Sequence, residues 1–345
     1  MYMRIARAGL AGAALMGFVH SAGAQDVTLK LHQMLPPQAD IPAKVLKPWA
    51  DKIEAESGGR IKVQHFPAMQ LGGKPPALYD QVKDGVVELT WTLSGYAPGR
   101  FAKSETFELP FMTAQSAEAT SAAAWEFYDK HLRDEYADTH VLAVHVHGPG
   151  VLHMRGAAVT KLEDLKGKRL RGPSRIVNDL LGRLGASPVG MPVTAAPEAL
   201  SKGVIDGTVI PWEVTRPLRI TELVDTHTEF SGPRGLYTAF FVFTMNKDAY
   251  DNLPADLKKV IDDNSGLELS RQFGRLMDEG DAHGRELAVK RGNEIVTLGP
   301  EEVDRWKAAS KPVVADWVKA MDAKGYDAQG LIDDAKAMIA KYAGE

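Results

Sequence analysis

A guanidinium at the end of a short apolar strand is the group in this sequence best placed to do chemistry. The stretch KGKRLRGPS, residues 166–174, alternates arginine with leucine and then stops at Gly172 and Pro173. Arg171 is the last side chain before this turn, and Ser174 is suited to cap a following helix. An arginine can hold a carboxylate through two parallel hydrogen bonds, and a helix N-terminus also favours an anion. The spacing therefore predicts a carboxylate site at Arg171, with Ser174 as a second donor.

A lone arginine near a strand end has a simpler alternative, which the spacing leaves open. Such residues are commonly solvated surface groups or partners in structural ion pairs. Arg169, two residues earlier on the same strand, fits that description.

Histidines suggest a different kind of site. His145 and His147 share one face of an expected strand and His153 follows, so a zinc site could be drawn. No acidic residue at a suitable spacing completes the set. We therefore expect no metal, and treat His147 as a hydrogen-bond donor to a ligand.

Motifs of catalysis are missing from the sequence. It contains no G-x-S-x-G elbow, H-E-x-x-H, P-loop or G-x-G-x-x-G motif. Carboxylates are abundant, but a paired acid and base cannot be identified from one dimension. We expect no enzyme and no cofactor, and keep a periplasmic hydrolase as the least favoured alternative.

The elements that position these residues follow an alternating order. Residues 27–34 (VTLKLHQM) and 60–66 (RIKVQHF) alternate as strands, and a helical pattern over 43–56 separates them, which favours a parallel sheet with a crossover helix. The same order recurs through strands at 140–147, 168–173 and 235–246. From 254 to about 291 only glycines interrupt a helical pattern, and at about 1.5 Å per residue such a helix could connect two lobes.

The N-terminus indicates the compartment. Arg4 and Arg7, a short apolar run over 10–19 and the sequence AGA at 22–24 predict a signal peptide over residues 1–24, with a membrane anchor as the alternative. The chain of 345 residues has no cysteine and a net charge of −4, so thiol chemistry is excluded and no basic face indicates nucleic acid. A soluble periplasmic protein of two lobes is expected, because the mature length exceeds a single core.

Several segments together resemble the extracytoplasmic solute-binding proteins of TRAP transporters, the DctP-like family. The central stretches are LEDLKGKRLRGPS and LGASPVGMPVTAAPEALSKGVIDG; KPWADKIEAESGGRIKVQHFPAMQLGG, LYDQVKDGVVELTW, ELPF and YDNLPADLKKVI match in order along most of the mature chain. Each is weak alone, but their order and coverage make the resemblance strong.

The resemblance implies an α/β, two-lobed periplasmic binding fold, type II-like, with a long helix crossing both lobes. We expect lobe I over 25–148 plus 235–275 and lobe II over 149–234 plus 276–345, with the helix at about 254–291 spanning both. The resemblance also implies delivery of the solute to a small and a large membrane subunit, and it assigns Arg171 to the carboxylate clamp. A module presenting its ligand to a membrane receptor would bind in the same way and stays an alternative.

Departures from the sugar-acid binders of this family narrow the expected ligand. Gly150 stands where those relatives place a second arginine, and Ile210 where they place an asparagine; Leu93 and Tyr96 replace a glutamate and an arginine of the sialic acid binders. A buried polar group left unpaired costs about 1–3 kcal/mol, so the ligand should carry few hydroxyl groups. A small monocarboxylate, partly apolar or aromatic, such as a 2-oxo or 2-hydroxy acid, is expected.

Aromatic residues are the expected walls of the site, although core packing is the alternative for each of them. The full set of expected ligand-binding residues is Arg171, Trp212, Tyr96, Trp91, His147, Ser174, Phe240, Gly150 and Leu93, with Phe111 as a further wall. Whether Glu213 and Arg175 face the pocket is left open; Glu213 inside it would suit a zwitterionic ligand. We expect a monomer.

Overall fold

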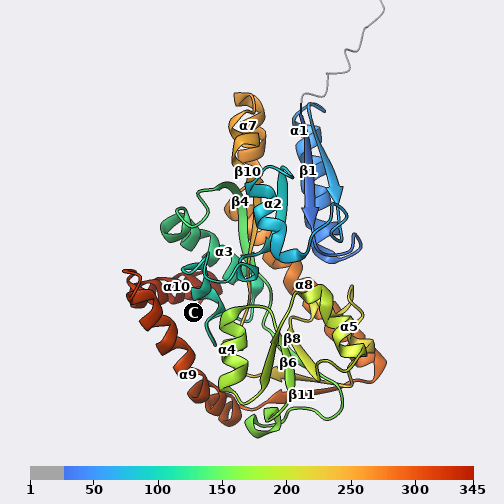
Figure 1. Cartoon of the computed structure of the whole chain (residues 1–345), viewed down its shortest axis with the longest axis vertical. Helices are drawn as coiled ribbons and strands as arrows, with labels where there is room; N and C mark the ends of the chain where they lie inside the picture. Colours follow the sequence, from blue (N-terminus) through green and yellow to red (C-terminus); the bar gives the residue numbers. More distant parts are fainter. Residues whose placement is uncertain (1–26) are drawn as a thin grey trace, which may run out of the picture.

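The computed structural model describes residues 27–345 and contains two β-sheets (Figure 1). The first sheet begins with the alternating apolar residues that follow position 26. The signal peptide expected over 1–24 lies outside the described residues. The sheet has five strands in the order β2-β1-β3-β10-β4. Strands β1, β2 and β3 are parallel, and β10 pairs antiparallel with β3 and β4. Their bounds are β1 Val27–Gln33, β2 Ile61–Phe66, β3 Leu89–Leu93, β4 Thr139–Val146 and β10 Phe240–Asn246.

The second sheet has six strands in the order β11-β9-β5-β8-β6-β7. Strand β6 is parallel to β7 and β8, β9 is parallel to β11, and β5 runs antiparallel to β8 and β9. Their bounds are β5 Val151–Met154, β6 Arg169–Gly172, β7 Ser187–Gly190, β8 Gly207–Ile210, β9 Thr226–Phe230 and β11 Glu294–Leu298. Arg171 therefore lies near the carboxyl end of a central parallel strand, where loops of an α/β sheet bind ligands.

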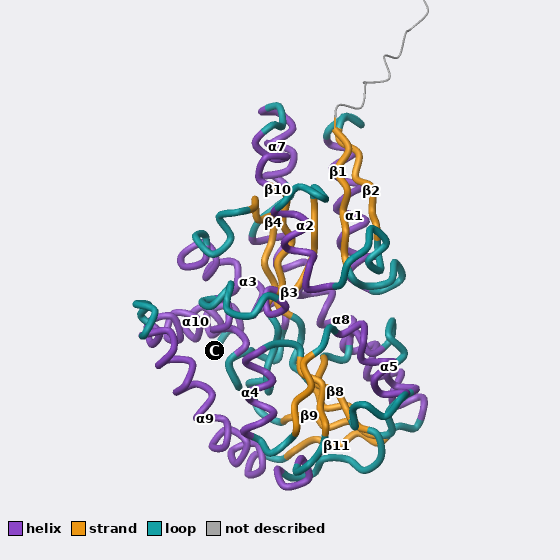
Figure 2. The backbone as a smooth tube through the Cα atoms, in the orientation of Figure 1, coloured by secondary structure: helices purple, strands orange, loops and turns teal. Residues whose placement is uncertain are grey.

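Helices surround the two sheets, and Figure 2 shows strands concentrated in two separate regions with helices around them. This is the α/β, two-lobed architecture expected from the sequence. The α-helices are α1 Lys47–Glu56, α2 Leu78–Lys83, α3 Ala117–Phe127, α4 Arg175–Arg183, α5 Ala196–Ser201, α6 Lys247–Asp251, α7 Ala255–Asp263, α8 Leu267–Arg291, α9 Pro300–Asp322 and α10 Ala328–Ala343. No helix within residues 27–345 has the length and apolar character needed to cross a membrane.

The helical segment expected over 254–291 is not continuous, and that part of the prediction is wrong. Helix α7 ends at Asp263, and α8 begins after Gly266, whose φ of 90° is outside the helical region. The amide of Gly266 donates a 2.7 Å hydrogen bond to the carbonyl of Leu142 in β4 instead of continuing a helix. The long helix that remains is α8, with 25 residues.

Helix α8 contacts both lobes at glycines that allow close approach. A Cβ on Gly274 would lie 2.4 Å from the carbonyl oxygen of Ala117 in the first lobe, and one on Gly284 would lie 2.2 Å from that of Trp212 in the second. Since any larger side chain would push these neighbours away, the glycines fix α8 against both lobes.

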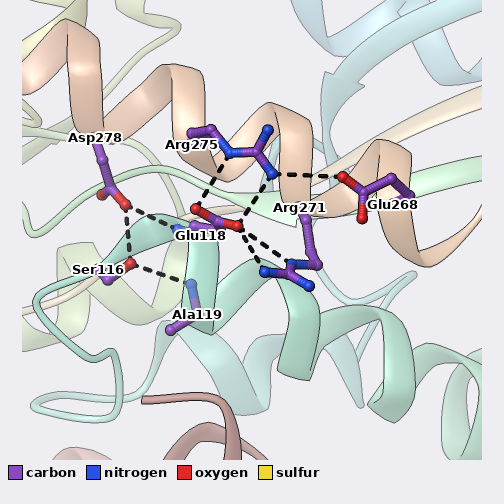
Figure 3. A network of polar contacts seen from close by, with 7 residues as sticks. All are labelled: Ser116, Glu118, Ala119, Glu268, Arg271, Arg275 and Asp278. Carbon is purple, nitrogen blue, oxygen red and sulfur yellow. Dashed lines mark hydrogen bonds and ion pairs between the residues drawn. The ribbon is translucent and has the colours of Figure 1, made fainter. Parts of the chain in front are cut away.

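Polar contacts also join α8 to the first lobe (Figure 3). The carboxylate of Asp278 accepts from the hydroxyl of Ser116 at 2.9 Å and from the amides of Ala117 and Glu118 at 2.6 and 3.1 Å, which satisfies the N-terminal amides of α3. Glu118 in turn pairs with Arg271 and Arg275 of α8. These side chains are accounted for by the packing of α3 on α8.

The chain after α8 does not stay in one lobe. Strand β11 joins the second sheet, but α10 packs against α3. The domain limits given above place all of 276–345 in lobe II, so the position of α10 departs from them. The exact limits of the lobes stay a prediction.

Candidate functional site

A cavity lies between the two sheets and takes its walls from both lobes and α8. Most of its walls are apolar or aromatic, as is usual at small-molecule sites. Residues on or next to strands of the first sheet line it: Met34, Leu35, Trp91, Leu93, Tyr96, His147, Tyr237 and Phe241. Residues on or next to strands of the second sheet also line it: Arg171, Pro173, Val193, Ile210, Pro211, Glu213 and Val214. Helix α8 contributes Met277.

Arg171 provides the cavity with a buried positive charge. Its side chain is 1 % exposed. The Nε donates to the carbonyl of Met191 at 2.8 Å, and Nη1 lies 3.4 Å from that of Val209. The remaining nitrogen, Nη2, is buried and has no hydrogen-bond partner within residues 27–345.

No carboxylate of the described residues neutralises this guanidinium, whose hydrogen bonds go to backbone carbonyls. Removing an uncompensated charge from water is costly, and buried charges are normally paired. A ligand carboxylate in the cavity would supply both the missing charge and the missing acceptor for Nη2.

Two tyrosine hydroxyls lie beside this charge. The hydroxyl oxygen of Tyr96 accepts from the amide of Val193 at 3.0 Å, so its own proton remains available for an acceptor in the cavity. The hydroxyl of Tyr237 donates to the carbonyl of Val209 at 2.8 Å. Burial raises the pKa of both phenols, while the Arg171 charge acts in the opposite direction. Both therefore stay protonated at neutral pH.

His147 is a neutral ring at the cavity wall. Its Nδ1 lies 2.5 Å from the carbonyl oxygen of Gly148, which can only accept, so the proton resides on Nδ1 and Nε2 is an acceptor. Burial, together with the charge of Arg171, lowers the pKa of His147 to about 4. The sequence led us to expect a donor here, whereas this geometry offers the cavity an acceptor.

Trp91 and Phe241 form a flat aromatic wall. Their rings stack at 5.1 Å with an angle of 10° between planes. The indole Nε1 of Trp91 donates to Nε2 of His145 at 2.8 Å, so the buried polar edge of the indole is satisfied away from the ligand space. Leu93, two residues along β3, also lines the cavity.

Five of the nine residues expected at the site thus line one cavity: Arg171, Trp91, Leu93, Tyr96 and His147. Ser174 and Phe240 lie elsewhere, in a smaller cavity with Glu105 and Glu108. The hydroxyl of Ser174 caps α4, accepting from the amide of Val177 at 3.4 Å. Capping uses the oxygen of Ser174 as an acceptor, and its hydroxyl does not line the cavity that contains Arg171.

Trp212 and Gly150 line a third cavity, away from Arg171. The indole of Trp212 donates to Glu229 at 2.9 Å and packs near His153 and His227. Gly150 acts on the site indirectly, because a Cβ there would lie 1.9 Å from a ring carbon of Tyr237. The glycine thus makes room for a cavity-lining ring.

The structure shows where Glu213, Arg175 and Phe111 lie relative to the cavity. Glu213 lines the cavity, and burial raises its pKa to about 8. Arg175 does not line it, and instead pairs with Glu105 at 2.5 Å. Phe111, the further expected wall, packs against Phe230 outside the cavity.

Sequence reasoning missed Tyr237, Phe241 and Met277 as lining residues. Phe241 faces the same way as Leu93 only because β10 inserts between β3 and β4, a pairing between distant segments. Gly150 was a signal for Tyr237, since a glycine following a strand can mark the close approach of another group.

The histidines do not form a metal site. His145 accepts at Nε2 from the indole of Trp91 in the first sheet, whereas His153 belongs to the second sheet, where its Nδ1 lies 2.7 Å from Nδ1 of His227. Within residues 27–345, no three histidine or acidic side chains gather in an arrangement that would hold a metal ion.

Comparison with known proteins gives consistent matches. The family model of bacterial extracellular solute-binding protein family 7, DctP, matches residues 32–320. One similar structure is a TRAP solute-binding protein from an unidentified marine microbe, described as specific for aromatic acid ligands and solved with 3-hydroxybenzoate. It is 48% identical to this chain, the match covers 92% of this chain and 99% of that chain, and the TM-score is 0.90. A TRAP solute-binding protein from Rhodoferax ferrireducens, with copurified benzoate, is also 48% identical, with 92% and 98% covered and a TM-score of 0.89. One from Bordetella bronchiseptica, with bound (R)- and (S)-mandelate, is 29% identical, with 91% and 99% covered and a TM-score of 0.84.

Proposed function

Because the chain belongs to family 7 of the bacterial extracellular solute-binding proteins, the DctP family, we propose that its cavity holds an aromatic monocarboxylate for a TRAP transporter. The family and the similar structures are binding proteins, so the chain binds a small organic acid and is not an enzyme. The aromatic character of the ligand and the residues that hold it are the proposed part.

The observation that supports a carboxylate most directly is the unpaired Nη2 of Arg171 in a cavity lined by that residue. Nε and Nη1 donate hydrogen bonds to the carbonyls of Met191 and Val209, so the guanidinium is held in place before a ligand binds. A carboxylate accepting from Nη2 and from the Tyr96 hydroxyl would complete the hydrogen bonds of both residues.

The walls favour one carboxylate and a flat apolar body. Arg171 is the one cation among the cavity-lining residues of the described chain. A second carboxylate would be buried without a partner, at a cost of several kcal/mol. The stacked rings of Trp91 and Phe241 offer a planar surface suited to an aromatic ring. Two relatives of 48% identity hold benzoate and 3-hydroxybenzoate.

Delivery completes the proposed role. The signal peptide over 1–24 would export the chain to the periplasm, where the monomer would carry its ligand to the small and large membrane subunits. The matched family consists of extracellular solute-binding proteins, and the similar structures are of TRAP solute-binding proteins, which supports this role.

A ligand screen by thermal shift and calorimetry tests the proposal. Benzoate, 3-hydroxybenzoate and mandelate should raise the melting temperature, since a ligand at one hundred times its dissociation constant stabilises the folded state by about 2.7 kcal/mol. Succinate and glucuronate serve as dicarboxylic and sugar-acid controls and should have little effect. A protein stabilised by these controls and not by the aromatic acids would contradict the proposal.

A further inference from the structure

A second buried polar atom without a partner belongs to a residue that lines the cavity, in addition to Nη2 of Arg171. Within residues 27–345, these two are the buried unpaired side-chain atoms that belong to cavity-lining residues, and the second is Oε1 of Glu213. Glu213 is 2 % exposed. A buried polar group without a partner costs free energy, so an unpaired atom on a residue that lines a binding cavity is suited to a hydrogen bond with a ligand.

The position of Glu213 is fixed by α8. Its backbone amide donates to Oδ1 of Asp281 at 2.6 Å. A Cβ on Gly280 would lie only 2.5 Å from Cγ of Glu213, so the glycine lets the side chain lie directly against the helix. The carboxyl group is therefore held at the cavity wall, and the wall residue Met277 lies one turn earlier on the same helix.

The charges around Glu213 are already used by another residue. Lys44 and Arg216 lie 2.8 and 2.7 Å from Oδ1 of Asp40, which binds both of them. Although burial acts to raise the pKa of Asp40, the hydrogen bonds from these two cations lower it below its ordinary value, so Asp40 is ionised. For Glu213, burial and the negative charge of Asp40 together raise the pKa to about 8.

Glu213 is accordingly a carboxylic acid at neutral pH, with one O–H donor and one carbonyl acceptor. Asp281, which is also buried and has a raised pKa, accepts from the backbone of Glu213 and offers no positive charge. A neutral acid group pairs well with a hydroxyl group, which can both donate and accept. It pairs poorly with an ammonium ion, which would first require the acid to lose its proton.

We propose that Glu213 binds a hydroxyl substituent of the aromatic acid whose carboxylate is held by Arg171. The inference rests on the proposed function and narrows the ligand class to hydroxylated aromatic acids. The unsubstituted acid would leave Oε1 of Glu213 unpaired, so the hydroxylated ligand should bind about tenfold more tightly.

Calorimetry with matched ligands tests this inference. Benzoate, 3-hydroxybenzoate, 4-hydroxybenzoate and 3-methoxybenzoate are titrated into the wild-type protein and into Glu213→Met, which has nearly the same length and suits the apolar wall. We expect the best hydroxybenzoate to bind about tenfold more tightly than benzoate in the wild type and no more tightly than benzoate in Glu213→Met. Glu198→Met, at an exposed surface ion pair with Lys202, is the matched control and should keep the wild-type ratio.

A second variant separates hydroxyl from ammonium recognition. Glu213→Gln keeps a neutral donor and acceptor, so it should retain most of the preference for the hydroxybenzoate. If the zwitterion 3-(aminomethyl)benzoate binds most tightly to the wild type and Glu213→Gln loses it, Glu213 acts as an ionised carboxylate and the inference is overturned.

Infrared difference spectra provide a readout that does not depend on the folding of any variant. In the wild-type protein, the carbonyl band of a protonated carboxyl group should shift when 3-hydroxybenzoate replaces benzoate. An unchanged band, or an equal affinity ratio in the wild type and Glu213→Met, overturns the role of Glu213 alone. Failure of every aromatic acid to bind the wild type overturns the proposed function instead.

Discussion

Replacement of Arg171 by methionine should remove acid binding without destabilising the unliganded protein. The buried guanidinium has no acidic partner within residues 27–345, so the free protein carries the cost of an uncompensated charge. Methionine has a similar length and no charge. The substitution should therefore lower the affinity for the ligand and leave the unliganded protein at least as stable as the wild type.

The size of the effect on affinity follows from the burial of the charge. Truncating one partner of a buried, hydrogen-bonded charge pair costs about 2–5 kcal/mol, which corresponds to a rise in Kd of about 30-fold to several thousand-fold. For the unliganded protein, the carbonyl of Met191 loses its donor, at a cost of about 1 kcal/mol. The carbonyl of Val209 keeps the hydroxyl of Tyr237 at 2.8 Å. Relief of the desolvation of the charge, several kcal/mol, exceeds that loss.

The assay combines titration calorimetry with benzoate and urea unfolding of the unliganded protein. Arg169→Met is the matched control, because Arg169 is on the same strand but forms an exposed ion pair with Asp206, and its Kd should equal that of the wild type. Two results would refute the reasoning: an Arg171→Met affinity within twofold of the wild type, or an unliganded variant that is several kcal/mol less stable.

Three further perturbations have defined outcomes. Gly150→Ala should raise the Kd for benzoate at least about tenfold, because its Cβ would force the ring of Tyr237 out of the cavity wall; calorimetry measures this. Arg175→Ala, which removes an exposed partner of Glu105, should change the Kd less than about threefold and leave the order of ligands unaltered in the same titrations. Burial raises the pKa of Glu108 to about 7, so the native state keeps a proton that the unfolded state has lost, and the free energy of unfolding falls as pH rises from the ordinary glutamate pKa of 4.5 through 7. Glu108→Gln should remove that component, so urea unfolding between pH 5.5 and 8 should show the wild type losing stability relative to the variant.

Much of the fold could be predicted because its strands carry regular patterns. Strands β1 and β2 alternate apolar and polar residues, and the crossover helix between them ends at a pair of glycines. The break between α7 and α8 could not be predicted in this way. Gly274 and Gly284 lie within α8, where other backbones pack closely against them, whereas Gly266 turns the chain toward Leu142. The sequence offers the same residue type in each case, and only its neighbours decide the outcome.

The candidate site could be predicted where one strand end or one alternation carried it, as for Arg171 and for Trp91. Prediction failed where a side chain had two apolar environments to choose from. Trp212 follows β8 at the rim of the cavity, yet its indole turns to Glu229 on the other side, since burying the ring N–H requires an acceptor. Phe241 was missed because β10 pairs with β3 across some 150 residues of chain.

The positions of the hydrogen bonds around Arg171 link ligand binding to contact between the lobes. The guanidinium donates hydrogen bonds to the carbonyls of Met191 and Val209 in the second lobe. Tyr96, which follows β3 of the first sheet, and Tyr237, which precedes β10 of that sheet, form their hydrogen bonds with Val193 and with the same Val209 carbonyl. A carboxylate that neutralises Arg171 would therefore lie where these contacts between the lobes are made. Separating the lobes would return both the charge and the tyrosine hydroxyls to water. A bound acid should therefore favour the arrangement in which the lobes touch. The size of this preference is set by how much more tightly the acid binds to that arrangement than to the separated one.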